Sequence, residues 1–116
     1  MRPSVLIVDD HAGFRASARA LLELQGFEVV GEADDGEAAL EAAARLLPDI
    51  VLLDVQLPGM DGFEVAELLA ATPDAPRVVL ISSRRRAAYE PRLPAAAVAG
   101  FLGKHELTGA ALAALL

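Results

Sequence analysis

Residues that can do chemistry lie directly after short apolar runs of this sequence. Two aspartates follow residues 4–8, one aspartate follows residues 50–53, two serines follow residues 78–81, and a lysine follows residues 100–103; these are Asp9, Asp10, Asp54, Ser82, Ser83 and Lys104. The other nine basic residues are all arginine, so the chain retains a single lysine at this type of position.

Carboxylates, a hydroxyl and an ammonium together suit phosphoryl transfer. Clustered carboxylates repel one another unless a cation joins them, and a site with few oxygen ligands and spare water positions suits Mg²⁺. An ammonium and a hydroxyl offset the charge on transferring phosphoryl oxygens. One carboxylate would then be the nucleophile, as in aspartyl-phosphate chemistry.

The apolar runs alternate with helix-period segments, which predicts a parallel sheet covered on both faces. The expected strands are 4–8, 28–33, 50–53, 78–81 and 100–103, and the expected helices are 12–24, 35–46, one opened by Asp61 and Gly62, and 107–116. The second helix is expected to bury Leu40, Ala43, Ala44 and Leu47. The fold class is therefore a doubly wound α/β domain, whose ligands bind beyond the carboxyl ends of the strands.

Composition narrows the class of protein. The 116 residues suffice for one domain with one core. The absence of cysteine excludes disulfides and thiolate chemistry. A net charge of −7 disfavours direct nucleic-acid or membrane binding. No apolar run is long enough for a membrane span, so a cytoplasmic location is expected. Ser82 and Ser83 lack a G-x-S-x-G context, which argues against a serine hydrolase.

The sequence resembles the receiver domain of two-component response regulators, the CheY-like superfamily, over nearly its whole length (1–116). Four segments carry the resemblance: Val5–His11, Leu52–Gly62, the strand end at Ser82, and Gly100–Lys104. The resemblance implies a flavodoxin-like sheet with strand order 2-1-3-4-5 and helices on both faces.

The resemblance also implies a role for each site residue. Asp54 would be the phosphoacceptor, and Asp10 and Asp54 would bind Mg²⁺ directly. Asp9 would act on the ion through water, and the backbone carbonyl of Gln56 would complete the protein ligands. Ser82 and Lys104 would contact phosphoryl oxygens, and Phe101 would be the aromatic residue that changes rotamer in the switch.

Further expectations concern partners. The resemblance implies a sensor histidine kinase as phosphodonor and a homodimer as one possible assembly. The Asp-Asp-His opening is similar to the branch that usually carries a C-terminal helix-turn-helix domain, through which DNA would be bound and transcription controlled. The chain stops within an apolar helix, which suggests a fragment, although a stand-alone receiver is also compatible.

Three departures from the family pattern stand out. His105 replaces a proline that often follows the lysine, so a trans peptide is expected. Arg84–Arg86 places basic residues beside the site, either as a solvated helix start or to steer a phosphodonor. Pro91 and Pro94 fall where the family has its fourth helix, so no regular helix is expected to run unbroken from 85 to 97.

Three functions remain open from the sequence. The leading one is a switch that is phosphorylated once and is not a turnover enzyme. The second is an Mg²⁺-dependent aspartyl-phosphate phosphatase, although Gln56 stands where such enzymes place an acid. The third is a degenerate receiver acting by protein contact alone. His11 is expected to be a partly exposed neighbour of the acid pair, and Phe14, Phe27 and Phe63 to be core residues.

Overall fold

The fold is built on a five-stranded, all-parallel sheet. The computed structural model describes residues 2–84, 86–89, 91–92 and 98–116. The strands are β1 (Ser4–Val8), β2 (Glu28–Ala33), β3 (Ile50–Asp54), β4 (Arg77–Ser82) and β5 (Gly100–Gly103). Their order is β2-β1-β3-β4-β5, which confirms the predicted fold class and topology.

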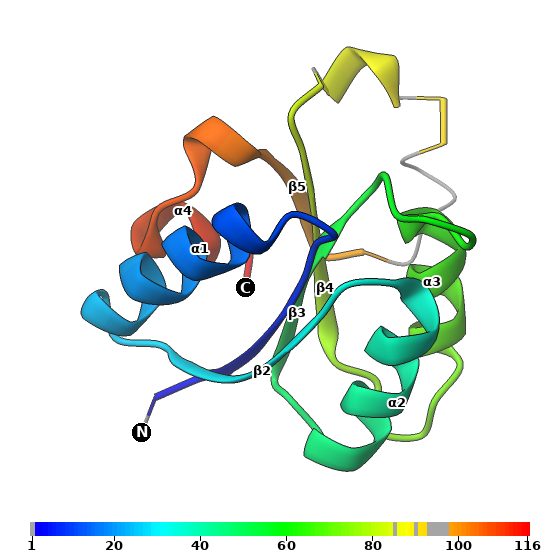
Figure 1. The fold of residues 1–116 in the computed structure, drawn as a ribbon, viewed down its shortest axis with the longest axis horizontal. Helices are drawn as coiled ribbons and strands as arrows, with labels where there is room; N and C mark the ends of the chain where they lie inside the picture. The colour runs from blue at the N-terminus through cyan, green and yellow to red at the C-terminus, as the bar shows by residue number, and fades with distance from the viewer. Residues whose placement is uncertain (1, 85, 90, 93–97) are drawn as a thin grey trace.

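Helices cover both faces of the sheet (Figure 1). On one face lie α1 (Ala12–Leu24) and α4 (Gly109–Ala113), and on the other lie α2 (Gly36–Leu46) and α3 (Gly62–Ala70). Each face has its own apolar cluster, one including Phe63 and the other including Phe27. Phe14 is partly buried against the second cluster, so the aromatic residues named from the sequence do pack in the core.

The middle strands are apolar on both faces because helices cover both. Every residue of β3 is buried, from Ile50 to Asp54, and residues 5–8 of β1 are inaccessible to solvent. Near-continuous hydrophobic runs of this kind are typical of parallel strands. A carboxylate that ends such a strand is therefore held in a rigid and poorly solvated place.

Side-chain caps start three of the helices close to the predicted positions. Asp35 accepts a hydrogen bond from the Ala38 N–H at 2.8 Å, and Asp61 accepts one from the Glu64 N–H at 3.0 Å. Thr108 accepts from the Ala111 N–H at 2.9 Å. Each cap satisfies one of the backbone donors that a helix leaves unpaired at its first turn.

Two details of the helices differ from the sequence prediction. Ala44 and Leu47 are exposed, and the buried residues of α2 include Ala39, Ala42 and Ala43. Leu47 lies beyond the helix in the left-handed region (φ 48°), where it no longer follows the helical face. The last helix is shorter than 107–116: Thr108 caps its start, and α4 spans only Gly109–Ala113.

The segment after β4 is described only in part. Arg86–Ala88 form a short 3₁₀ helix (η1), and Tyr89, Pro91 and Arg92 lie in turns. The described residues of this segment thus contain no helix that continues through Pro91, as expected from the missing proline N–H. The rest of that prediction falls on residues 85, 90 and 93–97, which lie outside the described residues.

Arg15 and Arg19 of α1 fasten that helix to β2 through Glu32. Glu32 pairs with Arg15 Nε at 3.0 Å and with Arg19 Nε at 2.8 Å. The hydrogen bond from Arg19 lowers the pKa of Glu32, and the contact with Arg15 adds to this effect. Burial acts in the opposite direction but is outweighed, so the pKa of Glu32 lies below its ordinary value. Arg15 also donates to the backbone carbonyl of Asp9 at 2.6 Å, so this network extends to the backbone at the end of β1.

Replacing Glu32 with glutamine is expected to lower the free energy of unfolding at neutral pH by no more than about 1 kcal/mol, because partly exposed ion pairs contribute little. A carboxylate with a depressed folded-state pKa stabilises the protein above its unfolded-state pKa, and this contribution is lost as the pH falls through the folded-state pKa. Urea unfolding of the parent and of Glu32→Gln should therefore converge in acid. A Glu28→Gln variant on the same strand is the matched control, and an equal loss there would contradict the interpretation.

Candidate phosphoacceptor and metal site

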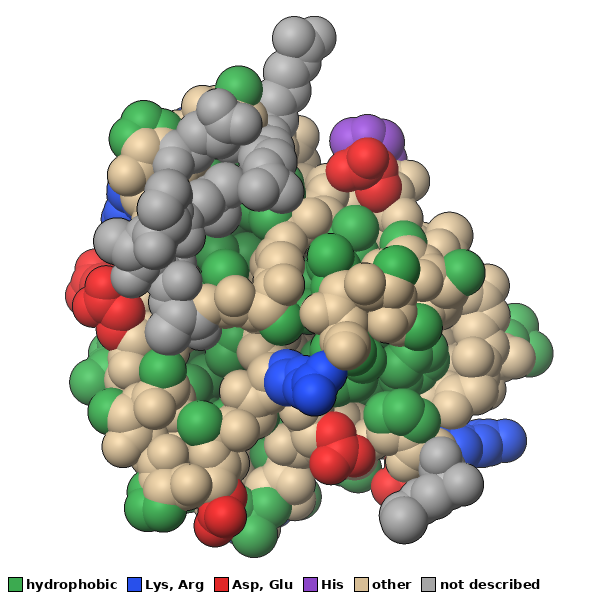
Figure 2. All heavy atoms as spheres, turned by 180° about the vertical axis from the view of Figure 1, so that it is seen from behind, with side chains coloured by type: hydrophobic (Ala, Val, Ile, Leu, Met, Phe, Trp, Pro, Cys, Tyr) green, Lys and Arg blue, Asp and Glu red, His purple; other side chains and the backbone are tan. Residues whose placement is uncertain are grey.

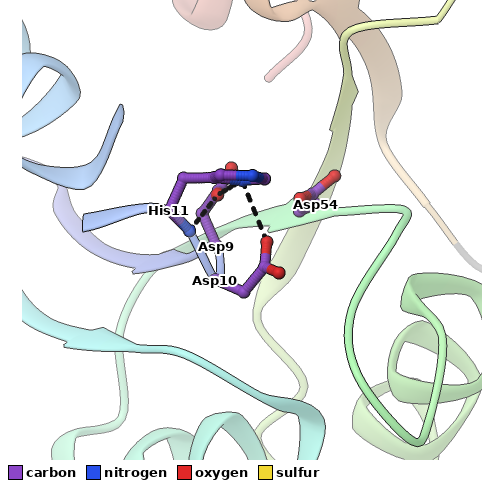
Figure 3. A group of neighbouring side chains, drawn as sticks. All are labelled: Asp9, Asp10, His11 and Asp54. Carbon is purple, nitrogen blue, oxygen red and sulfur yellow. Dashed lines mark hydrogen bonds and ion pairs between the residues drawn. The ribbon is translucent and has the colours of Figure 1, made fainter. Parts of the chain in front are cut away.

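The carboxyl ends of β1 and β3 bring three carboxylates together (Figure 3). Asp9 and Asp10 follow β1, and Asp54 is the last residue of β3. One ligand atom from each of these residues and from His11 lies within 4.8 Å of the others. Asp9 is 0% exposed and Asp54 is 3% exposed, whereas Asp10 faces solvent.

Lys104 reaches the buried carboxylates from the end of β5. Its Nζ lies 2.5 Å from Asp9 Oδ2 and 3.3 Å from Asp54 Oδ2. The ring of Phe14 lies 4.7 Å from the same ammonium, a favourable cation–π distance. The peptide between Lys104 and His105 is trans, as predicted. The lysine thus reaches the site through a short 3₁₀ turn, Lys104–Glu106 (η3).

The site contains more buried negative charge than Lys104 alone can balance. Burial, and then the charge of Asp9, raise the pKa of Asp54, while the Gln56 N–H and Lys104 partly oppose this rise. Burial lowers the pKa of the Lys104 ammonium, but its contacts with Asp9 and Asp54 outweigh burial, and the net shift is upward. Negative charge concentrated in this site contributes to the rise of both pKa values. A further cation would therefore be stabilising there.

The residues present fit a magnesium ion. Asp9, Asp10 and Asp54 offer hard carboxylate oxygens, the ligand type that Mg²⁺ prefers. Asp9 Oδ2 is buried and, among the described residues, accepts no well-aligned hydrogen bond; its one close contact is the ion pair with Lys104. Because the same ammonium also serves Asp54, one positive charge is shared between two buried carboxylates, and a divalent cation would balance the remainder.

The start of α3 packs closely against the end of β3, and the loop after Asp54 joins them. The Gln56 N–H donates to Asp54 Oδ1 at 3.2 Å, and the Gly62 N–H donates to the Val55 carbonyl at 2.8 Å. A Cβ on Gly62 would lie 2.4 Å from the Asp54 carbonyl oxygen, so this approach requires glycine. The position of the loop that holds the Asp54 carboxylate therefore depends on a residue that has no side chain.

Ser82 lies at the same end of the sheet and is 1% exposed. Its Oγ lies 3.1 Å from the Tyr89 hydroxyl and accepts the Arg84 N–H at 3.0 Å. Phe101 is buried, and its ring packs on Tyr89 with the centroids 5.8 Å apart. Sequence reasoning missed Tyr89, although the only tyrosine of the chain, seven residues after Ser82, was a signal that could have identified it.

His11 lies on the solvent side of Asp9 and Asp10. Its side chain is 71% exposed, and Nδ1 lies 3.1 Å from Asp9 Oδ1 and 3.0 Å from Asp10 Oδ1 (Figure 3). The His11 N–H also donates to Asp9 Oδ1 at 2.8 Å. The histidine is thus an exposed neighbour of the carboxylates, as expected from the sequence.

The basic residues after Ser83 are described only in part. The guanidinium of Arg84 lies 3.2–3.3 Å from the side-chain amide of Gln56, a distance at which the amide oxygen accepts a hydrogen bond when it is turned toward the arginine. Arg85 lies outside the described residues, so a cluster made of all three arginines is a prediction only. On the face drawn in Figure 2, the described basic side chains stand apart from one another, with acidic side chains near them.

The geometry defines a class of protein, and comparison with known proteins gives the same class. The family described as "Response regulator receiver domain" matches residues 5–115. The chain therefore belongs to the response regulator receiver domain family. The receiver domain of the response regulator NarL from Mycobacterium tuberculosis superposes with a TM-score of 0.87 and 39% identity, over 98% of this chain and 96% of that one.

Longer relatives share the same segment. The response regulator GacA of Pseudomonas viridiflava is 40% identical over 114 residues, which are 97% of this chain and 51% of that protein. The virulence-factor transcription regulator BvgA of Bordetella pertussis is 38% identical over 106 residues, 91% of this chain and 51% of that protein. The chain thus spans about half the length of these curated relatives. Within the described residues, no helix has the length and apolarity needed to cross a membrane.

Proposed function

We propose that this chain is a phosphorylation switch in which Asp54 accepts a phosphoryl group. The observation that carries the proposal is the placement of Asp54: a buried carboxylate with its Oδ2 3.3 Å from the only lysine, beside Asp9 and Asp10. The buried position of Asp54 leaves its carboxylate next to the Lys104 ammonium, which can balance part of the charge that a phosphoryl group would bring to the site.

The chain's own residues would position and stabilise the transfer. An Asp54 carboxylate oxygen attacks phosphorus, a new O–P bond forms, and the P–N or P–O bond to the donor breaks with its electron pair leaving on the donor. The Lys104 ammonium, already between Asp9 and Asp54, would pair with a phosphoryl oxygen. The Ser82 hydroxyl would donate a hydrogen bond to a second phosphoryl oxygen.

Magnesium would be held by Asp10, Asp54 and the Gln56 backbone carbonyl, with Asp9 acting through water, and would neutralise charge on the transferring phosphoryl group. The Gln56 N–H keeps Asp54 Oδ1 in position, and Gly62 allows the loop that carries Gln56 to close on Asp54. Burial of Asp9 and Asp54 limits water around the acyl phosphate.

The proposed physiological donor is a sensor histidine kinase, and the proposed setting is the cytoplasm. Relatives such as BvgA carry the name of transcription regulators, and each is about twice as long as this chain. We propose that the whole protein controls transcription through a further C-terminal domain, which binds the DNA. The receiver domain does not bind DNA by itself. Phosphorylation would change the face that includes β5, and this face is where a homodimer would form.

Incubation with acetyl phosphate and Mg²⁺ tests the proposal. The expected result is one stable phosphoryl adduct per chain, detected by intact-mass spectrometry, without continued release of inorganic phosphate. Continued release would indicate a phosphatase instead. Gln56 argues against that outcome, because its amide contacts Arg84 and has no acidic proton. No adduct in the presence of Mg²⁺ would contradict the proposal and leave a degenerate receiver.

A further inference from the structure

The residue that sequence reasoning missed, Tyr89, is seated in the core beside the site. It is 9% exposed, and its ring lies between Phe63 and Phe101, with both pairs of centroids 5.8 Å apart. A buried tyrosine hydroxyl needs a hydrogen-bond partner. Among the described residues that partner is Ser82 Oγ, at 3.1 Å. An apolar ring thus holds a polar hydroxyl against the serine of the proposed phosphorylation site.

Within the described part of the chain, the hydrogen bonds of the Ser82 hydroxyl are made with residues that follow it in sequence. Its Oγ accepts the Arg84 N–H at 3.0 Å and bonds the Tyr89 hydroxyl. A serine hydroxyl has a single proton and two acceptor positions. This count alone allows Oγ to accept from both groups while its proton points elsewhere, so the bond to Tyr89 is lost only when the Ser82 side chain rotates and carries Oγ toward a phosphoryl oxygen on Asp54.

The backbone around Tyr89 is tied in turn to the start of α3. The Arg92 N–H donates to the Tyr89 carbonyl at 2.8 Å. The Arg92 guanidinium lies 4.0 Å from the centre of the Phe63 ring and 3.2 Å from Asp61 Oδ2. Tyr89 therefore contacts Ser82 through its hydroxyl, β5 through Phe101 and α3 through Phe63.

We propose that Tyr89 is a positioning residue of the phosphorylation site. Its hydroxyl holds Ser82 toward the Arg84–Tyr89 segment in the unmodified protein, and it loses this bond when Ser82 turns to a phosphoryl oxygen. The state of Asp54 is thereby passed to the turn at Tyr89–Arg92. Phe101 has no hydroxyl and takes part only through its ring contact with Tyr89. This inference rests on the proposed function of Asp54.

The composition provides a direct readout, because Tyr89 is the only tyrosine and the chain has no tryptophan. Intrinsic fluorescence therefore reports this side chain alone, in the unaltered protein. Beryllofluoride with Mg²⁺ serves as the probe for the phosphoryl group, and fluorine NMR measures its binding independently. The expected result is a change in tyrosine emission that follows beryllofluoride binding.

Two substitutions identify the hydrogen bond as the cause. In Ser82→Ala the tyrosine emission should no longer respond to bound beryllofluoride, whereas in Ser83→Ala, at the neighbouring exposed serine, the response should persist. Tyr89→Phe keeps the ring and removes the competing hydroxyl. It should bind beryllofluoride roughly two- to tenfold more tightly, the effect of one net hydrogen bond.

The outcomes separate this inference from the proposed function. If beryllofluoride binds by fluorine NMR but leaves tyrosine emission unchanged, Tyr89 does not sense the site and the inference is wrong. Weaker binding by Tyr89→Phe would also overturn it, because the hydroxyl would then support the modified state. If the parent protein binds no beryllofluoride at all, the proposed function itself fails.

Discussion

The variant Asp54→Asn is expected to lose phosphoryl incorporation completely while remaining folded. The substitution removes the nucleophilic oxygen pair but keeps a planar side chain of similar size, whose oxygen can still accept the Gln56 N–H now bonded at 3.2 Å. Intact-mass spectrometry after incubation with acetyl phosphate and Mg²⁺ measures the loss, and circular dichroism verifies the fold.

Asp34→Asn is the matched control for this experiment. Asp34 is an exposed carboxylate that follows β2 at the same edge of the sheet, so it tests whether any aspartate at this edge suffices. It should be phosphorylated like the parent. Full labelling of Asp54→Asn, or equal loss in both variants, would defeat the assignment of Asp54 as acceptor.

Magnesium is expected to stabilise the folded protein strongly. A ligand that binds only the folded state adds RT ln(1 + [L]/Kd), which is about 2.7 kcal/mol at a hundredfold excess over Kd. The physical source is the buried pair Asp9 and Asp54, which Lys104 balances only in part. Thermal unfolding at increasing MgCl₂, with ionic strength held constant by NaCl, measures the gain.

Substitutions at the acid cluster should have opposite effects with and without the ion. Burial and the charge of Asp9 raise the pKa of Asp54, so its ionised form destabilises the fold above that pKa. Asp54→Asn should therefore melt higher than the parent without Mg²⁺ and lose most of the gain from Mg²⁺. Asp10→Asn, at a more exposed ligand, should lose the gain with little change in the ion-free protein. A parent melting temperature that is indifferent to Mg²⁺ would count against a metal site.

The sequence predicted the arrangement of the site because parallel strands place their carboxyl ends at one edge. Asp9, Asp54 and Lys104 each follow an apolar run, and the rule for α/β sheets was enough to place them together. Leu47 was assigned wrongly to the core because the helical period was extended past the residue where α2 ends. Periodicity identifies a face, but it does not locate the last residue of a helix.

Tyr89 illustrates what the sequence did not reveal. The two prolines after it dominated the interpretation of its segment, and they carry no information about a side chain that folds back to Ser82. The contact joins the last residue of β4 to a residue seven positions later, directly after the 3₁₀ helix η1. Such short irregular segments have no repeating pattern from which a partner could be inferred.

The contact between Gly62 and Asp54 places a limit on how this chain can vary. A side chain at position 62 would overlap the backbone of Asp54 and Val55, at 2.4 and 2.8 Å, rather than a flexible group that could move aside. The requirement at this position is that no side chain be present, and a survey restricted to reactive side chains would overlook it. Engineering that grafts this acidic site onto another α/β scaffold would therefore need to transplant the glycine with the aspartates.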